Sequence, residues 1–146
     1  MVSLTGLNNR LLAAGDRLVA GLGQTSARWQ VLGTIVDAQH PQPVAWLARG
    51  MGANRQNVQR IVHDLERDGH VRFQPNPHHR QAHLVVLTEQ GQQAYDDAMR
   101  LRAPWVNALS DGLNPDDIQA TRKLLTLLRE RLERADRVYT GGDATF

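Results

Sequence analysis

Residues 52–88 constrain the fold of this chain most strongly, because they predict one helix followed at once by a β-hairpin. Asn54 is a residue type that often caps a helix, and Asp68-Gly69 provides the stop. Spacings of three and four predict the residues that the helix buries, namely Val58, Ile61, Val62 and Leu65. The outward face is then polar throughout: Arg55, Gln56, Asn57, Gln59, Arg60 and His63.

Two short β-like runs follow this helix, at 70–74 and 83–87, and flank a turn cluster that begins at Pro75-Asn76-Pro77. The tip between the runs is polar and carries Arg80. A helix with a hydrogen-bonding outer face, next to a hairpin with an arginine at its tip, is the layout of a DNA-reading winged helix-turn-helix. The sequence therefore predicts a mainly α (α+β) fold with a β-hairpin wing.

The rest of the chain predicts helices on both sides of this lobe. A first helix spans 3–21, Ser26 caps a second, and Pro43 opens a short third in its first turn. Thr88 caps a fifth helix, which Pro104 is expected to kink or interrupt. Asn114-Pro115 opens a last helix that runs to about Arg137.

Leucine stripes on the first and last helices exceed what a small winged-helix lobe needs to cover itself. One interpretation is a homodimer, in which paired lobes read two half-sites; the other is that both helices fold back on the chain's own core. We expect one subunit over 1–146, with a DNA-binding lobe at 26–88, N- and C-terminal dimerisation helices at 1–22 and 89–138, and a flexible tail at 139–146.

Composition narrows the function classes. The formal net charge of +2 is too small to indicate a nucleic-acid partner by itself, and the absence of cysteine excludes disulfides and Cys-ligated zinc. No apolar stretch approaches the length of a membrane span and no signal-peptide pattern is present, so we expect a cytoplasmic protein without membrane attachment. No catalytic motif is visible, and the histidines near the hairpin lack a regular ligand spacing. We therefore predict no enzyme activity, no metal and no cofactor.

Read in order, these elements resemble the MarR family of winged-helix regulators over nearly the whole chain. The resemblance rests on the order and spacing of five segments: Val44–Ala48, Asn54–Val62, Leu65–Gly69, Asn76–Ala82 and Leu87–Gly91. It implies an obligate homodimer that binds a near-palindromic operator in double-stranded DNA. It also implies release by a small effector, commonly aromatic or lipophilic, and therefore a repressor.

Carried over by position, the resemblance nominates a set of DNA-binding residues: Asn54, Arg55, Gln56, Asn57, Gln59, Arg60 and Arg80. The wing departs from the family pattern, in which an aspartate and an arginine commonly stand two positions apart. His79 and Gln81 occupy those places here, and Arg80 lies between them. The altered wing leaves an alternative open, a winged-helix dimer that binds another protein and not DNA.

An effector pocket is expected between the dimerisation helices and the DNA-binding lobe, where the resemblance puts such sites. Trp29 and Trp105 are candidates for its walls, and Arg17 is a candidate partner for a carboxylate. A tryptophan at helical spacing is, however, more often part of a core.

Overall fold

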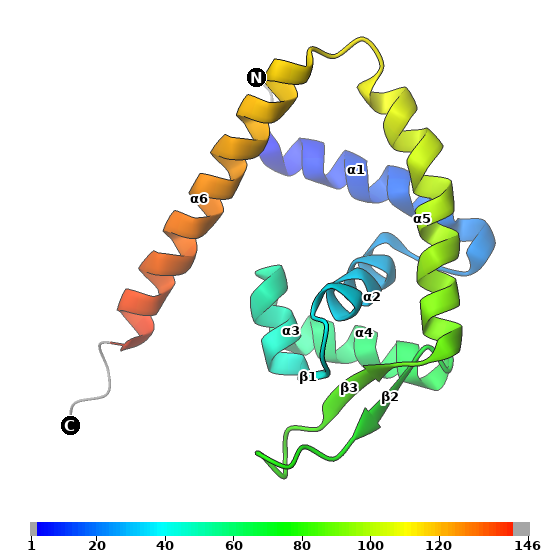
Figure 1. Cartoon of the computed structure of the whole chain (residues 1–146), viewed down its shortest axis with the longest axis vertical. Helices are drawn as coiled ribbons and strands as arrows, with labels where there is room; N and C mark the ends of the chain where they lie inside the picture. Colours follow the sequence, from blue (N-terminus) through cyan, green and yellow to red (C-terminus); the bar gives the residue numbers. More distant parts are fainter. Residues whose placement is uncertain (1–2, 142–146) are drawn as a thin grey trace. The chain divides into compact units, whose positions relative to one another are not determined.

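The computed structural model describes residues 3–141, which divide after Trp105 into two compact units. The first unit contains most of the elements (Figure 1): α1 (Leu4–Val19), a 3-10 turn (Ala20–Leu22), α2 (Ser26–Asp37), β1 (Gln42–Pro43), α3 (Val44–Met51), α4 (Arg55–Arg67), β2 (Val71–Gln74) and β3 (Leu84–Leu87). Helix α5 (Glu89–Ser110) crosses the division, and α6 (Pro115–Gly141) belongs to the second unit. The predicted fold class, mainly helical with a small antiparallel sheet, is confirmed.

The sheet has three strands in the order β1-β3-β2, all antiparallel. The predicted hairpin is present and pairs Val71 with Leu87 and Gln74 with Leu84. Strand β1, which pairs Gln42 with Val85, was not predicted, because a two-residue strand is too short to alternate. Its Pro43 is also the residue before α3 and not, as expected, part of the first turn of that helix.

The core of the first unit gathers side chains from α2, α3, α4 and the sheet. The four residues predicted for the buried face of α4 all lie in it, between 0% and 5% exposed. Burying a Val, Leu or Ile side chain contributes about 1.5–3 kcal/mol, so this face fixes the rotation of α4 about its axis. The polar side chains of α4 are thereby turned outward.

The caps of α4 and α5 were predicted correctly, whereas the cap of α2 was not. Asn54 caps α4, since its Oδ1 accepts the Asn57 amide, and Thr88 Oγ1 accepts the Gly91 amide at the start of α5. For α2 the prediction was wrong: Thr25 caps it by accepting the Arg28 amide, one residue before Ser26. The Ser26 hydroxyl is buried and donates instead to the Leu12 carbonyl of α1.

Two further predictions about the C-terminal helices need correction. Pro104 does not interrupt α5, which runs unbroken from Glu89 to Ser110. Helix α6 continues to Gly141, beyond the predicted end near Arg137, and the rest of the expected tail, 142–146, lies outside the described residues. The division of the chain into a lobe, dimerisation helices and a tail stays a prediction. Among the described residues, no helix is long and apolar enough to cross a membrane.

The start of α5 is fixed on the turn between α4 and β2. Thr88 donates its hydroxyl hydrogen to the Gly69 carbonyl at 2.7 Å, and its amide donates to the His70 carbonyl at 3.1 Å. Gly91 is buried there, and a Cβ atom at that position would lie 1.9 Å from the His70 carbonyl oxygen. The absence of a side chain at Gly91 therefore permits the close approach of α5.

Candidate nucleic-acid interface

The outward face of α4 forms the centre of the candidate interface. Residues 54–57 and 60 are exposed, while Gln59 is half-buried. Gln56, Arg60, His63 and Arg67 follow one another at spacings of four, three and four, opposite the buried row. A helix end with exposed amide and guanidinium groups offers the donors and acceptors that base edges require.

Several of these side chains already contact one another. Arg60 Nη2 donates to Asn57 Oδ1 at 2.9 Å, and Arg60 Nη1 lies 3.8 Å from Asp64 Oδ2. The Gln59 amide nitrogen is 2.9 Å from His63 Nε2. The sequence predicted which residues face outward but missed Asp64, although its spacing of four from Arg60 could have identified the pair.

The hairpin contacts α4 through tilted aromatic rings. Phe73 of β2 lies between His63 of α4 and His83, with centroid separations of 5.6 Å and 6.4 Å. These contacts fix the base of the wing beside the outward face of the helix. Within the first unit, the structure therefore brings α4 and the wing together as the sequence suggested.

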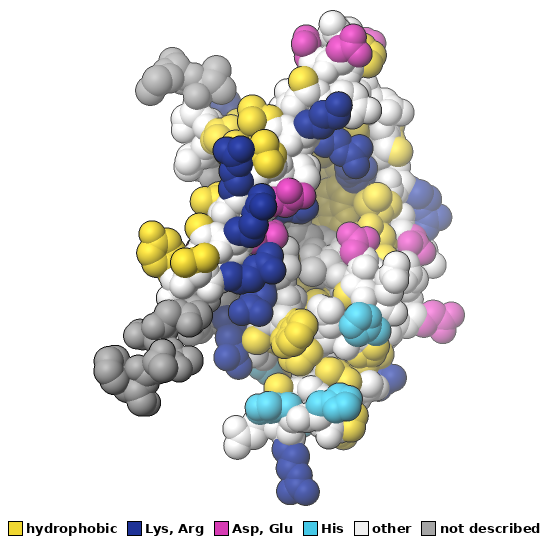
Figure 2. All heavy atoms as spheres, turned by 60° about the vertical axis from the view of Figure 1, so that its left-hand side comes forward, with side chains coloured by type: hydrophobic (Ala, Val, Ile, Leu, Met, Phe, Trp, Pro, Cys, Tyr) yellow, Lys and Arg dark blue, Asp and Glu magenta, His cyan; other side chains and the backbone are white. Residues whose placement is uncertain are grey.

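The wing tip is ordered by the side chain of Asn76. Its Nδ2 donates to the Ala82 carbonyl at 3.0 Å, and its Oδ1 accepts the His78 amide at 3.0 Å. Arg80 is exposed within this closed loop and has no intramolecular partner among the described residues. In Figure 2, histidine side chains lie in the lower part of the view and a Lys or Arg side chain projects at its lowest point, where the hairpin lies.

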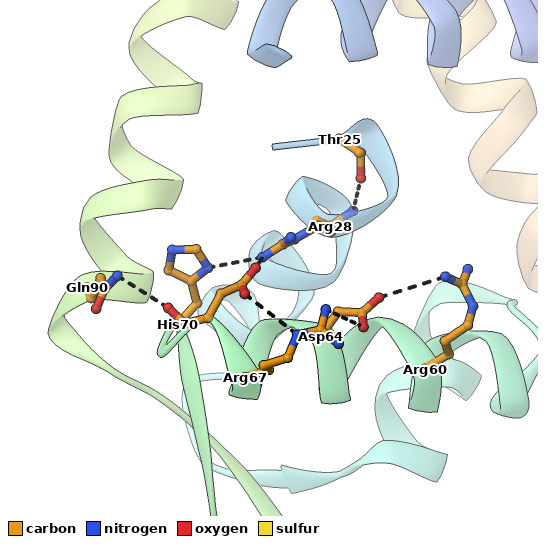
Figure 3. Close-up of polar contacts among 8 residues, drawn as sticks. Thr25, Arg28, Arg60, Asp64, Arg67, His70 and Gln90 are labelled. Atoms are coloured by element: carbon orange, nitrogen blue, oxygen red, sulfur yellow. Dashed lines mark hydrogen bonds and ion pairs between the residues drawn. The ribbon is translucent and has the colours of Figure 1, made fainter. Parts of the chain in front are cut away.

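A second polar cluster lies behind α4 and joins three segments of the chain (Figure 3). Arg28 of α2 donates to Asp68 Oδ2 at 2.6 Å and lies 3.4 Å from His70 Nδ1. Gln90 of α5 donates to the Asp68 carbonyl at 3.3 Å. The hydrogen bond from Arg28 lowers the pKa of Asp68, and burial together with the nearby Arg28 charge lowers the pKa of His70. This cluster connects the end of α4 to α2 and α5.

We expect His70 to make the protein less stable in mild acid. Below its ordinary pKa of 6.5, the unfolded chain binds a proton that the folded chain, with its lowered His70 pKa, does not. The free energy of unfolding should fall as the pH drops through this range, and Asp68 should add a loss of the same sign below pH 3.8. Urea denaturation between pH 8 and pH 5 should show a flatter pH profile for His70→Gln than for the native chain. His40→Gln, at an exposed position, is the control, and an unchanged profile in His70→Gln would contradict the assignment.

The effector candidates do not line the hollows that the structure describes. Arg17 is exposed, and Trp29 and Trp105 are half-buried. A hollow of about 540 Å³ in the first unit is lined by Leu22, Gln24, His70, Glu89, Gln90, Gln93, Ala94 and Asp97, and one of about 530 Å³ lies along α6. None of the three candidates lines either hollow. Within residues 3–141, no group of three or more His, Asp or Glu side chains could hold a metal ion.

Sequence comparison relates the chain to transcription regulators. The model of the MarR family matches residues 22–82. An uncharacterized protein of Mycobacterium tuberculosis is 41% identical over 123 residues, which cover 84% of this chain and 82% of that protein. The transcriptional activatory protein BadR of Rhodopseudomonas palustris is 30% identical over 132 residues, which cover 88% of this chain and 75% of BadR.

Solved structures share the fold. CouR from Rhodococcus jostii, bound to p-coumaroyl-CoA, superposes with a TM-score of 0.75 at 21% identity, covering 86% of this chain and 87% of that chain. A mutant of MarR from Escherichia coli, in complex with operator DNA, gives a TM-score of 0.73 at 24% identity, covering 86% of this chain and 92% of that chain.

Proposed function

This chain belongs to the MarR family of transcription regulators, and from that membership we propose that it is a homodimer that binds a near-palindromic operator in double-stranded DNA. The observation that carries the proposal is the exposed polar face of α4, held beside a basic wing by the rings of His63, Phe73 and His83. The MarR relative solved with operator DNA supports it through the shared fold. The chain would act in the cytoplasm as a regulator and not as an enzyme.

We assign different roles to the exposed residues. Arg60 has the donors for guanine, and Gln56, Asn57 and Gln59 have the donor and acceptor pairs for adenine. The remaining nominated residues, Arg55 and Arg80, would contact phosphates and position the protein without reading sequence. Asn54 would contribute through the helix start that it caps.

Dimerisation would use the leucines of the terminal helices. On α6 four apolar residues share one stripe and are 44–67% exposed: Ile118, Leu125, Leu128 and Leu132. Leu4 and Leu7 of α1 are 72% and 48% exposed. Such stripes normally lie in contact with another surface, and a second copy would place two α4 helices on half-sites about one helical turn apart.

A small molecule would regulate the binding of DNA. We propose a repressor that an aromatic or lipophilic effector releases; CouR bound to p-coumaroyl-CoA supports the ligand class, while the name of BadR describes an activatory protein. Trp29, Trp105 and Arg17 remain the proposed contacts. An effector can act only if it binds the DNA-bound and free states unequally. A compound that quenches tryptophan fluorescence should therefore also weaken operator binding, and quenching without a change in operator affinity would contradict the coupling.

Selection of bound fragments from a random DNA pool tests the function directly. We expect enrichment of one sequence with two related half-sites. Sedimentation of the complex should give two chains per DNA duplex. If no sequence is enriched, DNA reading is excluded and the remaining interpretation is a dimer that binds another protein.

Removing Arg80 should weaken DNA binding in a salt-dependent way. Arg80→Ala deletes one exposed cation at the wing tip, and the loss of one phosphate contact makes the slope of log affinity against log salt shallower by about 0.9. Lys123→Ala removes one exposed cation from α6 and serves as the control. An unchanged slope in Arg80→Ala would show that the altered wing does not contact DNA through this residue.

A further inference from the structure

Asp64 is a carboxylate on the helix that we propose reads DNA, where negative charge opposes binding. One of its oxygens lies 3.8 Å from Arg60 Nη1, and the other accepts a hydrogen bond from Arg67 Nη2 at 2.9 Å (Figure 3). The Asp64 side chain is 31% exposed, whereas that of Arg60 is 68% exposed. Asp64 thus contacts two arginines of the outward face of α4, Arg60 and Arg67.

The contacts of Arg60 restrict where its guanidinium group lies. Asn57 Oδ1 accepts from Nη2 at 2.9 Å and the Asp64 carboxylate lies near Nη1, so neighbours one helical turn before and after Arg60 both hold it. A guanidinium group has five N–H donors, and these two acceptors leave donors free for a bidentate contact with guanine. A long side chain that is held in advance loses less rotamer freedom when it binds.

The negative charge of Asp64 also favours base reading by Arg60 over contact with a phosphate. Two unit charges about 4 Å apart interact by about 1 kcal/mol even in water, which is a factor of about five in affinity. The carboxylate therefore disfavours a rotation of Arg60 toward a phosphate, and it weakens every complex that depends on phosphates alone. A complex in which Arg60 reads a base keeps the pair together.

We propose that Asp64 is a positioning residue that gives up general DNA affinity in exchange for sequence discrimination by Arg60. This inference rests on the proposed DNA-binding function and identifies a residue that determines its specificity. The other carboxylate on this part of α4, Glu66, lies 3.6 Å from His63 Nδ1, whereas the contacts of Arg60 are with Asn57 and Asp64. Glu66 therefore provides a matched comparison.

The test compares Asp64→Asn with the native chain on the selected operator and on a scrambled duplex. We expect affinity for the scrambled duplex to rise about fivefold and the ratio of operator to scrambled affinity to fall about tenfold. The salt slope on scrambled DNA should become steeper by about 0.9, because the released Arg60 contacts a phosphate. Asp64→Glu should restore the ratio, since a glutamate four residues from Arg60 keeps the charge and the reach.

Two controls separate positioning from a general charge effect. Glu66→Gln removes the same charge from α4 and should change affinity for both duplexes alike, leaving the ratio intact. In an Arg60→Ala background, Asp64→Asn should no longer change the ratio. Two results would overturn the inference, provided that the native chain discriminates between the duplexes. One is an unchanged ratio of operator to scrambled affinity in Asp64→Asn. The other is that Asp64→Asn lowers this ratio as much in the Arg60→Ala background as in the native chain. A native chain without any discrimination would instead overturn the proposed function.

Discussion

Replacing Leu125 and Leu128 together with aspartate is expected to leave the protein monomeric and almost unable to bind its operator. Both side chains lie on the exposed stripe of α6, and Leu125 also lines the hollow along that helix. Burying a leucine contributes about 1.5–3 kcal/mol, and two copies of the double change alter four side chains, so the dimer dissociation constant should rise at least about 1000-fold. Loss of the second half-site should lower operator affinity at least about 100-fold.

Sedimentation at micromolar concentration and operator titration measure the two effects. Gln119→Asp adds a charge to the same helix away from the stripe and should leave a dimer. The variant helices should keep their circular dichroism, because the stripe is already exposed in the single chain. A double variant that remains dimeric with native operator affinity would exclude α6 from the interface.

Among the single substitutions in the first unit, Gly91→Ala is expected to be the most destabilising. The new Cβ would lie 1.9 Å from the His70 carbonyl oxygen and 2.9 Å from Leu87 Cδ1, and backbone cannot move aside as a flexible side chain can. The start of α5 must shift, and the hydrogen bonds that Thr88 makes to Gly69 and His70 weaken with it. We expect a loss of about 3 kcal/mol in the free energy of unfolding, or about 10 °C in melting temperature.

Gly50→Ala is the matched control for this prediction. Gly50 lies in α3 with open space where a Cβ would stand, so alanine should leave stability unchanged or raise it by up to about 1 kcal/mol. Both variants should be melted at the same chain concentration, because dimerisation makes the melting temperature depend on it. Equal melting temperatures for Gly91→Ala and the native chain would show that α5 does not need this close approach.

The parts of the fold that the sequence predicted are those governed by local patterns. The buried row of α4 and the presence of a hairpin follow from periodicities of 3.6 and 2. Strand β1 was not predicted, because its pairing with β3 joins residues about forty positions apart and Gln42-Pro43 is too short to alternate. The cap of α2 was misplaced because serine is, by type, a somewhat better cap than threonine. The tertiary structure decides between them, because the buried Ser26 hydroxyl donates to the Leu12 carbonyl and leaves Thr25 as the cap.

In the candidate site too, local patterns predicted some features, while others depend on tertiary packing. The exposure of Gln56 and Arg60 follows from the helix period and was predictable. The pairing of Arg60 with Asn57 and Asp64 was within reach of spacing rules, whereas the approach of Arg28 to Asp68 and His70 was not. Those contacts form only when α2 packs against the end of α4, and no local pattern encodes that packing.

The Asn76 side chain closes the polar loop at the wing tip. By bonding to Ala82 on one side of the tip and to His78 on the other, it closes the loop before any DNA is present. Part of the conformational entropy of the tip is therefore lost during folding and not at the moment of binding. If the wing contacts DNA as we propose, it would approach the duplex with its loop already closed, and a groove that does not match this shape would bind it less tightly.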